Sequence, residues 1–72
     1  MEEQYKGYVI RITTEKDGSA FPWKRICRIL DGASREFIKQ IDWEIGYDTP
    51  DQAEKAGLMI SKKWIDAQER NL

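Results

Sequence analysis

The fold is decided by the stretch Tyr47-Asp-Thr-Pro-Asp-Gln-Ala-Glu-Lys-Ala-Gly-Leu-Met-Ile-Ser-Lys-Lys-Trp-Ile-Asp-Ala67. Its apolar residues recur with the period of a helix, so it predicts one long amphipathic helix. Thr49 suits the N-cap, because its hydroxyl can accept the amide hydrogen of Gln52 while the Gln52 side chain reaches back to the Thr49 amide. Pro50 then takes the first helical position, where a missing N–H group costs nothing.

One face of the predicted helix carries mostly small side chains. At 100° per residue six positions fall together, and four of them are small enough to let the helix lie close to a neighbouring layer. The six are Ala53, Ala56, Gly57, Ile60, Trp64 and Ala67. Leu58 and Ile65 fall on a flank away from this stripe. They either wrap the edge of the core or form a small exposed patch for a partner.

Three segments before the helix predict β-strands, because β-branched and aromatic residues alternate with polar ones in each. Asp-Gly pairs, which are turn signals, separate them at positions 17–18 and 31–32. The segments are Tyr5–Thr14, Ala20–Leu30 and Arg35–Ile45. Gly7 indicates a bulge or a close backbone approach. Residues 1–4 and 69–72 are expected to be frayed.

These elements predict one α+β domain over residues 1–72, a three-stranded antiparallel meander with one C-terminal helix on one face (β-β-β-α). In that order Tyr5–Thr14 and Arg35–Ile45 are the sheet edges, and the first is the more permissive to an incoming strand. The predicted core comprises Tyr8, Ile10, Ile12, Trp23, Cys27, Ile29, Phe37, Ile41, Trp43, Ile45, Ala53, Ala56, Ile60 and Trp64.

Composition limits the classes of partner. The 72 residues are 35% charged, yet their net charge is only −1 and the two signs are interspersed, as on an ordinary solvated surface. The opening Met-Glu-Glu-Gln lacks the basic and apolar regions of a signal peptide. No apolar run approaches the roughly 20 residues of a membrane span. We therefore expect a cytoplasmic protein that does not enter a membrane.

Residues that carry chemistry are scarce. The chain has no histidine, so the usual general base and the commonest metal ligand are missing. Cys27, the one cysteine, alternates in phase with strand apolars and is predicted to be a core residue. Asp42 with Glu44 fits a solvated strand face, and Asp48 with Asp51 fits the start of the helix. We therefore expect no enzyme activity, no cofactor and no metal site.

Several motifs together resemble a group of short bacterial proteins of unknown function that are β-β-β-α units of this length. The resemblance lies in Tyr5-Lys-Gly-Tyr-Val-Ile10, Tyr47-Asp-Thr-Pro-Asp-Gln-Ala53, Ala56-Gly-Leu58 and Trp64-Ile-Asp66. It covers nearly the whole chain. It implies the same fold and a bacterial cytoplasmic setting, and it brings no activity, cofactor or partner with it.

The sheet face that the helix leaves uncovered is the remaining candidate for function. The predicted alternation places on it Tyr5, Val9, Arg11, Lys24, Ile26, Arg28 and Ile38, next to Gln40, Asp42 and Glu44. Such a mixed face could dock an unidentified protein or a second copy of the chain, although we expect a monomer. The alternative is weak nucleic-acid binding through Arg11, Lys24 and Arg28, disfavoured by the acids on the third strand. The predicted interaction surface is Arg11, Lys24, Ile26, Arg28, Leu58 and Ile65.

Overall fold

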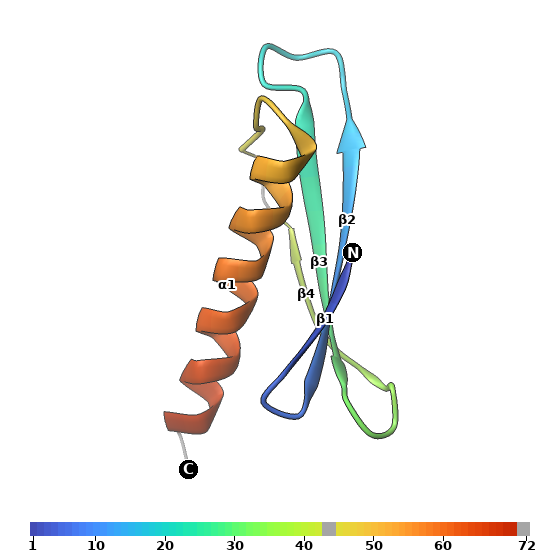
Figure 1. Ribbon diagram of the computed structural model, residues 1–72, viewed down its shortest axis with the longest axis vertical. Helices are drawn as coiled ribbons and strands as arrows, with labels where there is room; N and C mark the ends of the chain where they lie inside the picture. The colour runs from blue at the N-terminus through green and yellow to red at the C-terminus, as the bar shows by residue number, and fades with distance from the viewer. Residues whose placement is uncertain (43–44, 71–72) are drawn as a thin grey trace.

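The computed structural model describes residues 1–42 and 45–70 of the chain. It is an antiparallel sheet with strand order β1-β2-β3-β4 and one helix on one face (Figure 1). The elements are β1 (Glu2–Tyr5), β2 (Tyr8–Lys16), β3 (Trp23–Asp31), β4 (Phe37–Asp42) and α1 (Pro50–Arg70). The predicted α+β meander with a C-terminal helix is confirmed, but the sheet has four strands instead of three. The molecule is elongated, 41 × 22 × 15 Å, because α1 and the two long strands run along one axis.

β1 is the strand that the sequence reading missed. Its four residues pair with β2, from Glu2 opposite Arg11 to Tyr5 opposite Tyr8, so the prediction that residues 1–4 are frayed was wrong. The connecting turn is Lys6-Gly7, with φ of 48° and 83°. Two positive φ values are typical of the type I′ turn that closes two-residue hairpins, and lysine rarely adopts one. Because β1 pairs with β2, the predicted Tyr5–Thr14 strand is not an edge of the sheet.

β4 is shorter than predicted and contains a bulge. Lys39 lies opposite Ile29 and Phe37 lies opposite Leu30, which leaves Ile38 as the extra residue. The bulge reverses the alternation, so Phe37 shares the face of Leu30, away from α1, and is 58% exposed. Phe37 and Ile45, also 58% exposed, were therefore wrongly assigned to the core. The predictions for Trp43 and Glu44 lie outside the described residues.

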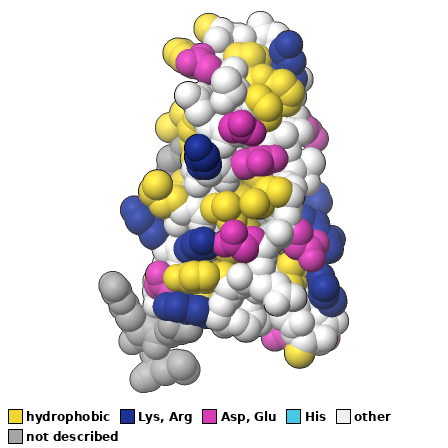
Figure 2. Space-filling model, in the orientation of Figure 1, with side chains coloured by type: hydrophobic (Ala, Val, Ile, Leu, Met, Phe, Trp, Pro, Cys, Tyr) yellow, Lys and Arg dark blue, Asp and Glu magenta, His cyan; other side chains and the backbone are white. Residues whose placement is uncertain are grey.

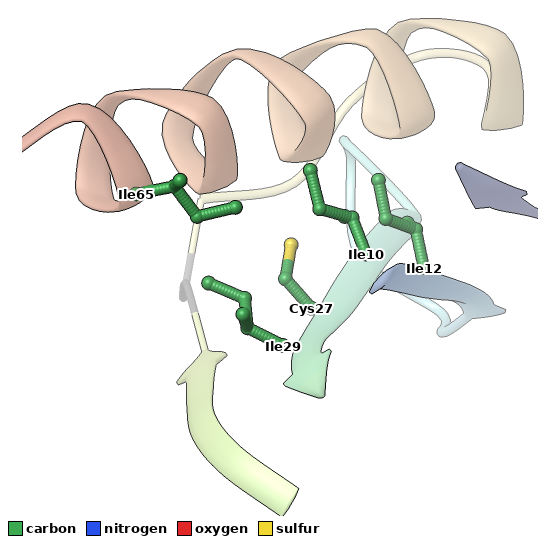
Figure 3. Packing of buried hydrophobic residues seen from close by; sticks show 5 residues of the cluster. All are labelled: Ile10, Ile12, Cys27, Ile29 and Ile65. Carbon is green, nitrogen blue, oxygen red and sulfur yellow. The ribbon is translucent and has the colours of Figure 1, made fainter. Parts of the chain in front are cut away.

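The core lies between α1 and the two central strands. Its centre is formed by Ile10, Ile12, Cys27, Ile29 and Ile65, which point toward one another in Figure 3. The first four were predicted core residues, as was Ala53, and all five are buried. The other predicted members that the structure describes are half-buried: Tyr8, Trp23, Ile41, Ala56, Ile60 and Trp64. Arg25 is also buried, at 1% exposure, which was not predicted. Its guanidinium lies 5.9 Å from the centroid of the Tyr47 ring.

The buried face of α1 is rotated from the predicted stripe. Fully buried positions recur every four residues, at Ala53, Gly57, Ser61 and Ile65, whereas Ala67 is exposed. A Cβ atom on Gly57 would lie only 3.0 Å from both the Cys27 Sγ and the Ile12 Cδ1 atoms. The row of α1 that faces the sheet is therefore the one whose side chains are mostly small, and not the row with the largest apolar side chains.

The start of α1 is close to the prediction. Pro50 is the first helical residue, and the Thr49 Oγ1 atom accepts a hydrogen bond from the Gln52 amide at 3.2 Å. The reciprocal bond differs from the predicted one, because the Gln52 Oε1 atom accepts from the Asp48 amide, at 3.2 Å, instead of from Thr49. Both bonds satisfy amide groups at the beginning of the helix, where no helical carbonyl is available to them.

The close approach at Gly57 yields a first prediction. Gly57→Val should lower the free energy of unfolding by about 1–3 kcal/mol, because the added methyl groups overlap Cys27 and Ile12. Helix propensity alone would favour valine over glycine, so a loss of stability isolates the steric effect. Urea denaturation measures it, with Ala67→Val on the exposed side as the control. An equal effect of both substitutions would contradict the close approach.

Ser61 yields a second prediction of opposite sign. Its hydroxyl is buried and has no hydrogen-bond partner in the part of the chain that the structure describes. Ser61→Ala removes this unpaired group and improves helix propensity, so the free energy of unfolding should rise by about 0.5–1 kcal/mol. A lower unfolding midpoint in the same denaturation experiment would show that the hydroxyl is bonded in solution.

Candidate interaction surface

The sheet face opposite α1 is organised in rows that cross the strands. One row runs from Glu2 to Arg11, from Arg11 to Arg28 and from Arg28 to Gln40, each pair being direct partners in the strand register. These residues alternate with the core residues of the same strands, so they lie on the uncovered face. Two arginines are thus direct cross-strand neighbours, an arrangement that disfavours the sheet unless anions lie nearby.

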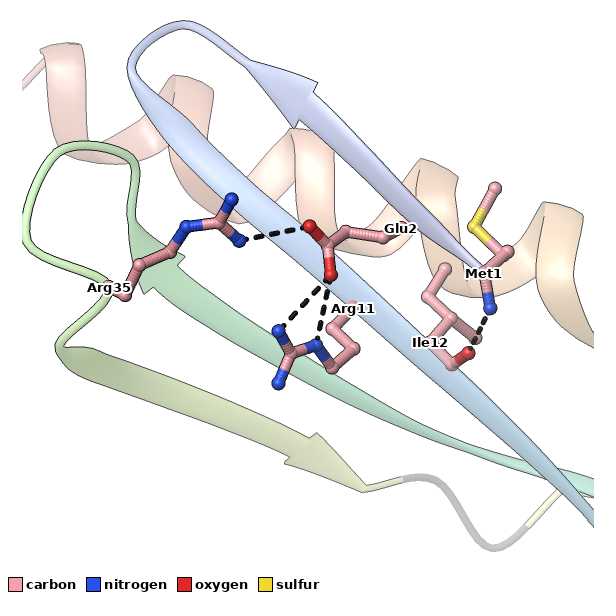
Figure 4. A network of polar contacts seen from close by, with 5 residues as sticks. All are labelled: Met1, Glu2, Arg11, Ile12 and Arg35. Carbon is pink, nitrogen blue, oxygen red and sulfur yellow. Dashed lines mark hydrogen bonds and ion pairs between the residues drawn. The ribbon is translucent and has the colours of Figure 1, made fainter.

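Among the described residues, a single carboxylate bonds to the arginines of this row. Glu2 accepts hydrogen bonds from the Arg11 Nε atom at 3.2 Å and the Arg35 Nη1 atom at 3.0 Å, and its Oε2 atom lies 3.1 Å from Arg11 Nη2. Figure 4 shows the Arg35 side chain extending from the β3–β4 turn toward Glu2 on β1. We call Arg11, Arg28 and Arg35 together with Glu2 the arginine cluster. It holds three cations and one anion.

Arg28 is the member of the cluster with no carboxylate partner among the described residues. Its Nε atom donates to the Gln40 Oε1 atom at 3.3 Å, and the Gln40 amide in turn donates to Asp42 at 3.1 Å. A neutral amide satisfies one donor but leaves the positive charge of Arg28 uncompensated. Elsewhere, over the face visible in Figure 2, basic and acidic side chains are interspersed.

An apolar row lies beside the arginine cluster. Val9, Leu30 and Phe37 are direct partners in the register. Val9 and Leu30 are buried although α1 does not cover this face, so neighbouring side chains lie over them. Phe37 and the bulged Ile38, 40% exposed, remain open to solvent. The face therefore places the arginine cluster beside exposed apolar side chains.

The other residues predicted for the interaction surface have different surroundings. Lys24 forms an ion pair with Asp17, Nζ to Oδ2 2.9 Å, and Ile26 is half-buried opposite Thr13 and Asp42. Leu58 is half-buried against the core cluster. Ile65 is fully buried in the core cluster, so of the two alternatives for the Leu58 and Ile65 flank the structure shows packing on the core and not an exposed patch.

Tyr5 was also placed on the wrong face, because it belongs to β1 and not to β2. It packs against the core cluster, and its hydroxyl donates to the Asp66 Oδ1 atom on α1 at 3.0 Å. Two ion pairs reinforce this link, Lys6 with Asp66 at 2.8 Å and Lys62 with Glu3 at 2.7 Å. The Glu3 carboxylate raises the pKa of Lys62. These contacts attach β1, and with it Glu2, to the rest of the molecule.

A shallow depression of about 410 Å³ lies where the two hairpin turns meet. It is lined by Gln4, Tyr5, Lys6, Gly7, Tyr8, Gly32 and Ala33. The approach expected for Gly7 is observed here, since its carbonyl accepts from the Gly32 amide at 2.9 Å. The charged side chain in the lining, Lys6, already pairs with Asp66. The depression is therefore a weaker candidate than the arginine cluster.

Among the residues that the structure describes, groups suited to catalysis are not gathered at either place. The Cys27 Sγ atom lies 3.5 Å from the Arg25 Nη1 atom, but Cys27 is fully buried beneath α1 and out of reach of a substrate. Within residues 1–42 and 45–70, no three His, Cys, Asp or Glu side chains are grouped closely enough to hold a metal ion. In the same residues, no helix is both long and apolar enough to cross a membrane.

A third prediction concerns the pKa of Glu2 in the arginine cluster. The hydrogen bond from Arg35, followed by that from Arg11, holds the pKa of Glu2 below the ordinary value of about 4.3. Such a carboxylate stabilises the fold above its unfolded pKa, and this contribution is lost as the pH falls through the lower folded pKa. Carbon-13 NMR should show the low pKa, and Arg35→Gln should raise it toward 4.3. An unchanged Glu2 titration in this variant would contradict the ion pair.

Comparison with models of known protein families found no match for the chain, and comparisons with curated proteins and with solved structures found none either. The resemblance to short bacterial β-β-β-α proteins therefore stays a prediction.

Proposed function

We propose that this protein is a non-catalytic protein-interaction module that binds its partner through the sheet face opposite α1. The observation that carries the proposal is the arginine cluster, with three guanidinium groups and one carboxylate, beside the exposed Phe37 and Ile38. Arginine and aromatic side chains are the residues most enriched where protein interfaces gain their binding energy. The sequence features described above suggest that the module works in a bacterial cytoplasm.

The position of α1 supports this choice of surface. The helix packs on β2 and β3, so a partner could reach that face of the sheet only by displacing α1. The flank proposed from the sequence contributes little, because Ile65 is fully buried and Leu58 packs on the core cluster. The opposite face carries no covering element in the part of the chain that the structure describes (Figure 1).

Nucleic-acid binding through Arg11, Lys24 and Arg28 is the alternative function. Nucleic-acid binding depends on basic side chains that contact phosphates, and Lys24 is already paired with Asp17. Single-strand binding also uses aromatic side chains on which bases stack. On the described strands of this face, Phe37 is the one exposed aromatic residue. A protein partner fits these surroundings better.

Affinity capture from a lysate of the host organism tests the proposed surface. The tagged protein is compared with the double variant Ile26→Asp, Arg28→Glu, which places negative charge on the open face. We expect this variant to lose the proteins that the unchanged chain retains, because an interface that opposes like charges is strongly weakened. Circular dichroism confirms that the variant is folded.

The matched control is Met59→Asp, Lys55→Glu on the outer side of α1, where both residues are exposed. It makes the same two types of substitution on the other side of the molecule and should keep the captured proteins. If both double variants retain the same proteins as the unchanged chain, the open face is not the binding surface. Retention of nucleic acid alone would favour the alternative function.

A further inference from the structure

We infer that the partner segment is an extended acidic peptide, with a carboxylate at the arginine cluster and a large apolar side chain two residues away against Phe37. This inference rests on the proposed function and specifies the class of partner. It follows from three features of the open face: a carboxylate already bound there, an arginine without one, and the spacing between the charged and apolar rows.

Glu2 shows how the cluster holds a carboxylate. Its oxygens accept from two different guanidinium groups, those of Arg11 and Arg35, at 3.0–3.2 Å. The two arginines come from β2 and from the β3–β4 turn, and Glu2 comes from β1 (Figure 4). Charge-assisted bonds of this kind are stronger than neutral ones and favour carboxylates, whose two oxygens match the guanidinium donors.

Arg28 provides the place for a second carboxylate. It lies directly opposite Arg11, and the side chains of such a pair begin about 5 Å apart, so one carboxylate can reach both guanidinium groups. In the described structure Arg28 bonds only to the neutral Gln40. A partner carboxylate between Arg11 and Arg28 would remove the repulsion between them and bring the cluster to two anions for three cations.

The adjoining apolar row sets the spacing of the partner. Arg28 and Leu30 are two residues apart on β3, and Leu30 lies opposite the exposed Phe37. Side chains two residues apart on an extended chain are roughly 6.6 Å apart and point the same way. An extended peptide lying along this face can therefore place an acidic residue on Arg28 and an apolar residue, two positions on, against Phe37.

The test uses the full ¹⁵N-labelled chain and NMR titration. The first probe is a nine-residue peptide with Glu-Thr-Phe at its centre, and the second replaces its Glu by Gln. A nine-nucleotide single strand of thymidine is the third. We expect the acidic peptide to shift the amide signals of Arg11, Arg28 and Phe37, and to bind about tenfold more tightly than the neutral one, since it gains a charge-assisted pair.

Two variants should move the affinity for the acidic peptide in opposite directions. Arg28→Gln should weaken it to the level of the neutral peptide. Glu2→Gln should strengthen it severalfold, because Arg11 and Arg35 lose their internal anion and both become free to bind the peptide. Misfolding cannot produce a gain in affinity, so this variant keeps the test decisive. Lys55→Gln, on the exposed side of α1, should leave the affinity unchanged.

Several results would overturn the inference. Equal binding of the acidic and neutral peptides, or no shift of open-face signals at millimolar peptide, excludes an acidic partner. Tighter binding of the DNA strand assigns the cluster to nucleic acid, and concentration-dependent dimerisation through the same amides assigns it to a second copy. The proposed function is judged separately: captured proteins lost with Ile26→Asp, Arg28→Glu but kept with Arg28→Gln would retain the module and reject the acidic partner.

Discussion

The fold depends on how closely α1 approaches the two central strands. Gly57 has no side chain to separate the helix from Cys27 and Ile12, and the positions one turn to either side, Ala53 and Ser61, are small and fully buried. This short distance brings Ile65 against Ile10, Ile12, Cys27 and Ile29, where it completes the core. A domain of this size has little apolar surface to bury, so close packing of a few side chains supplies much of its stability.

The same packing separates the two faces of the sheet. Alternation along β2 and β3 directs one set of side chains under the helix and the other set, which includes Arg11 and Arg28, into solvent. A charge in the core carries a large desolvation cost, so Arg11 and Arg28 lie on the open face, and Arg25 is the buried exception on β3. The hairpin of β1 then brings Glu2 beside Arg11, and the β3–β4 turn brings Arg35 to the same carboxylate.

The open face consequently carries two features that do not stabilise the fold. Of its two cross-strand arginines, only Arg11 pairs with a carboxylate among the described residues, while the bulge in β4 turns Phe37 and Ile38 outward instead of into the core. Neither feature strengthens the fold: like charges oppose strand pairing, and exposed apolar groups forgo burial. Both suit a surface that gains its missing contacts from a partner.

Local patterns in the sequence determined the helix start at Thr49 and Pro50, the antiparallel meander and the outward placement of Arg11 and Arg28, because capping and alternation act between near neighbours. Tertiary structure decided the rest. The row of α1 that faces the sheet depended on the volume available at Gly57, and the phase of Phe37 depended on a bulge that only pairing with β3 reveals. Glu2 meets partners 9 and 33 residues away, so no local pattern could have disclosed the arginine cluster.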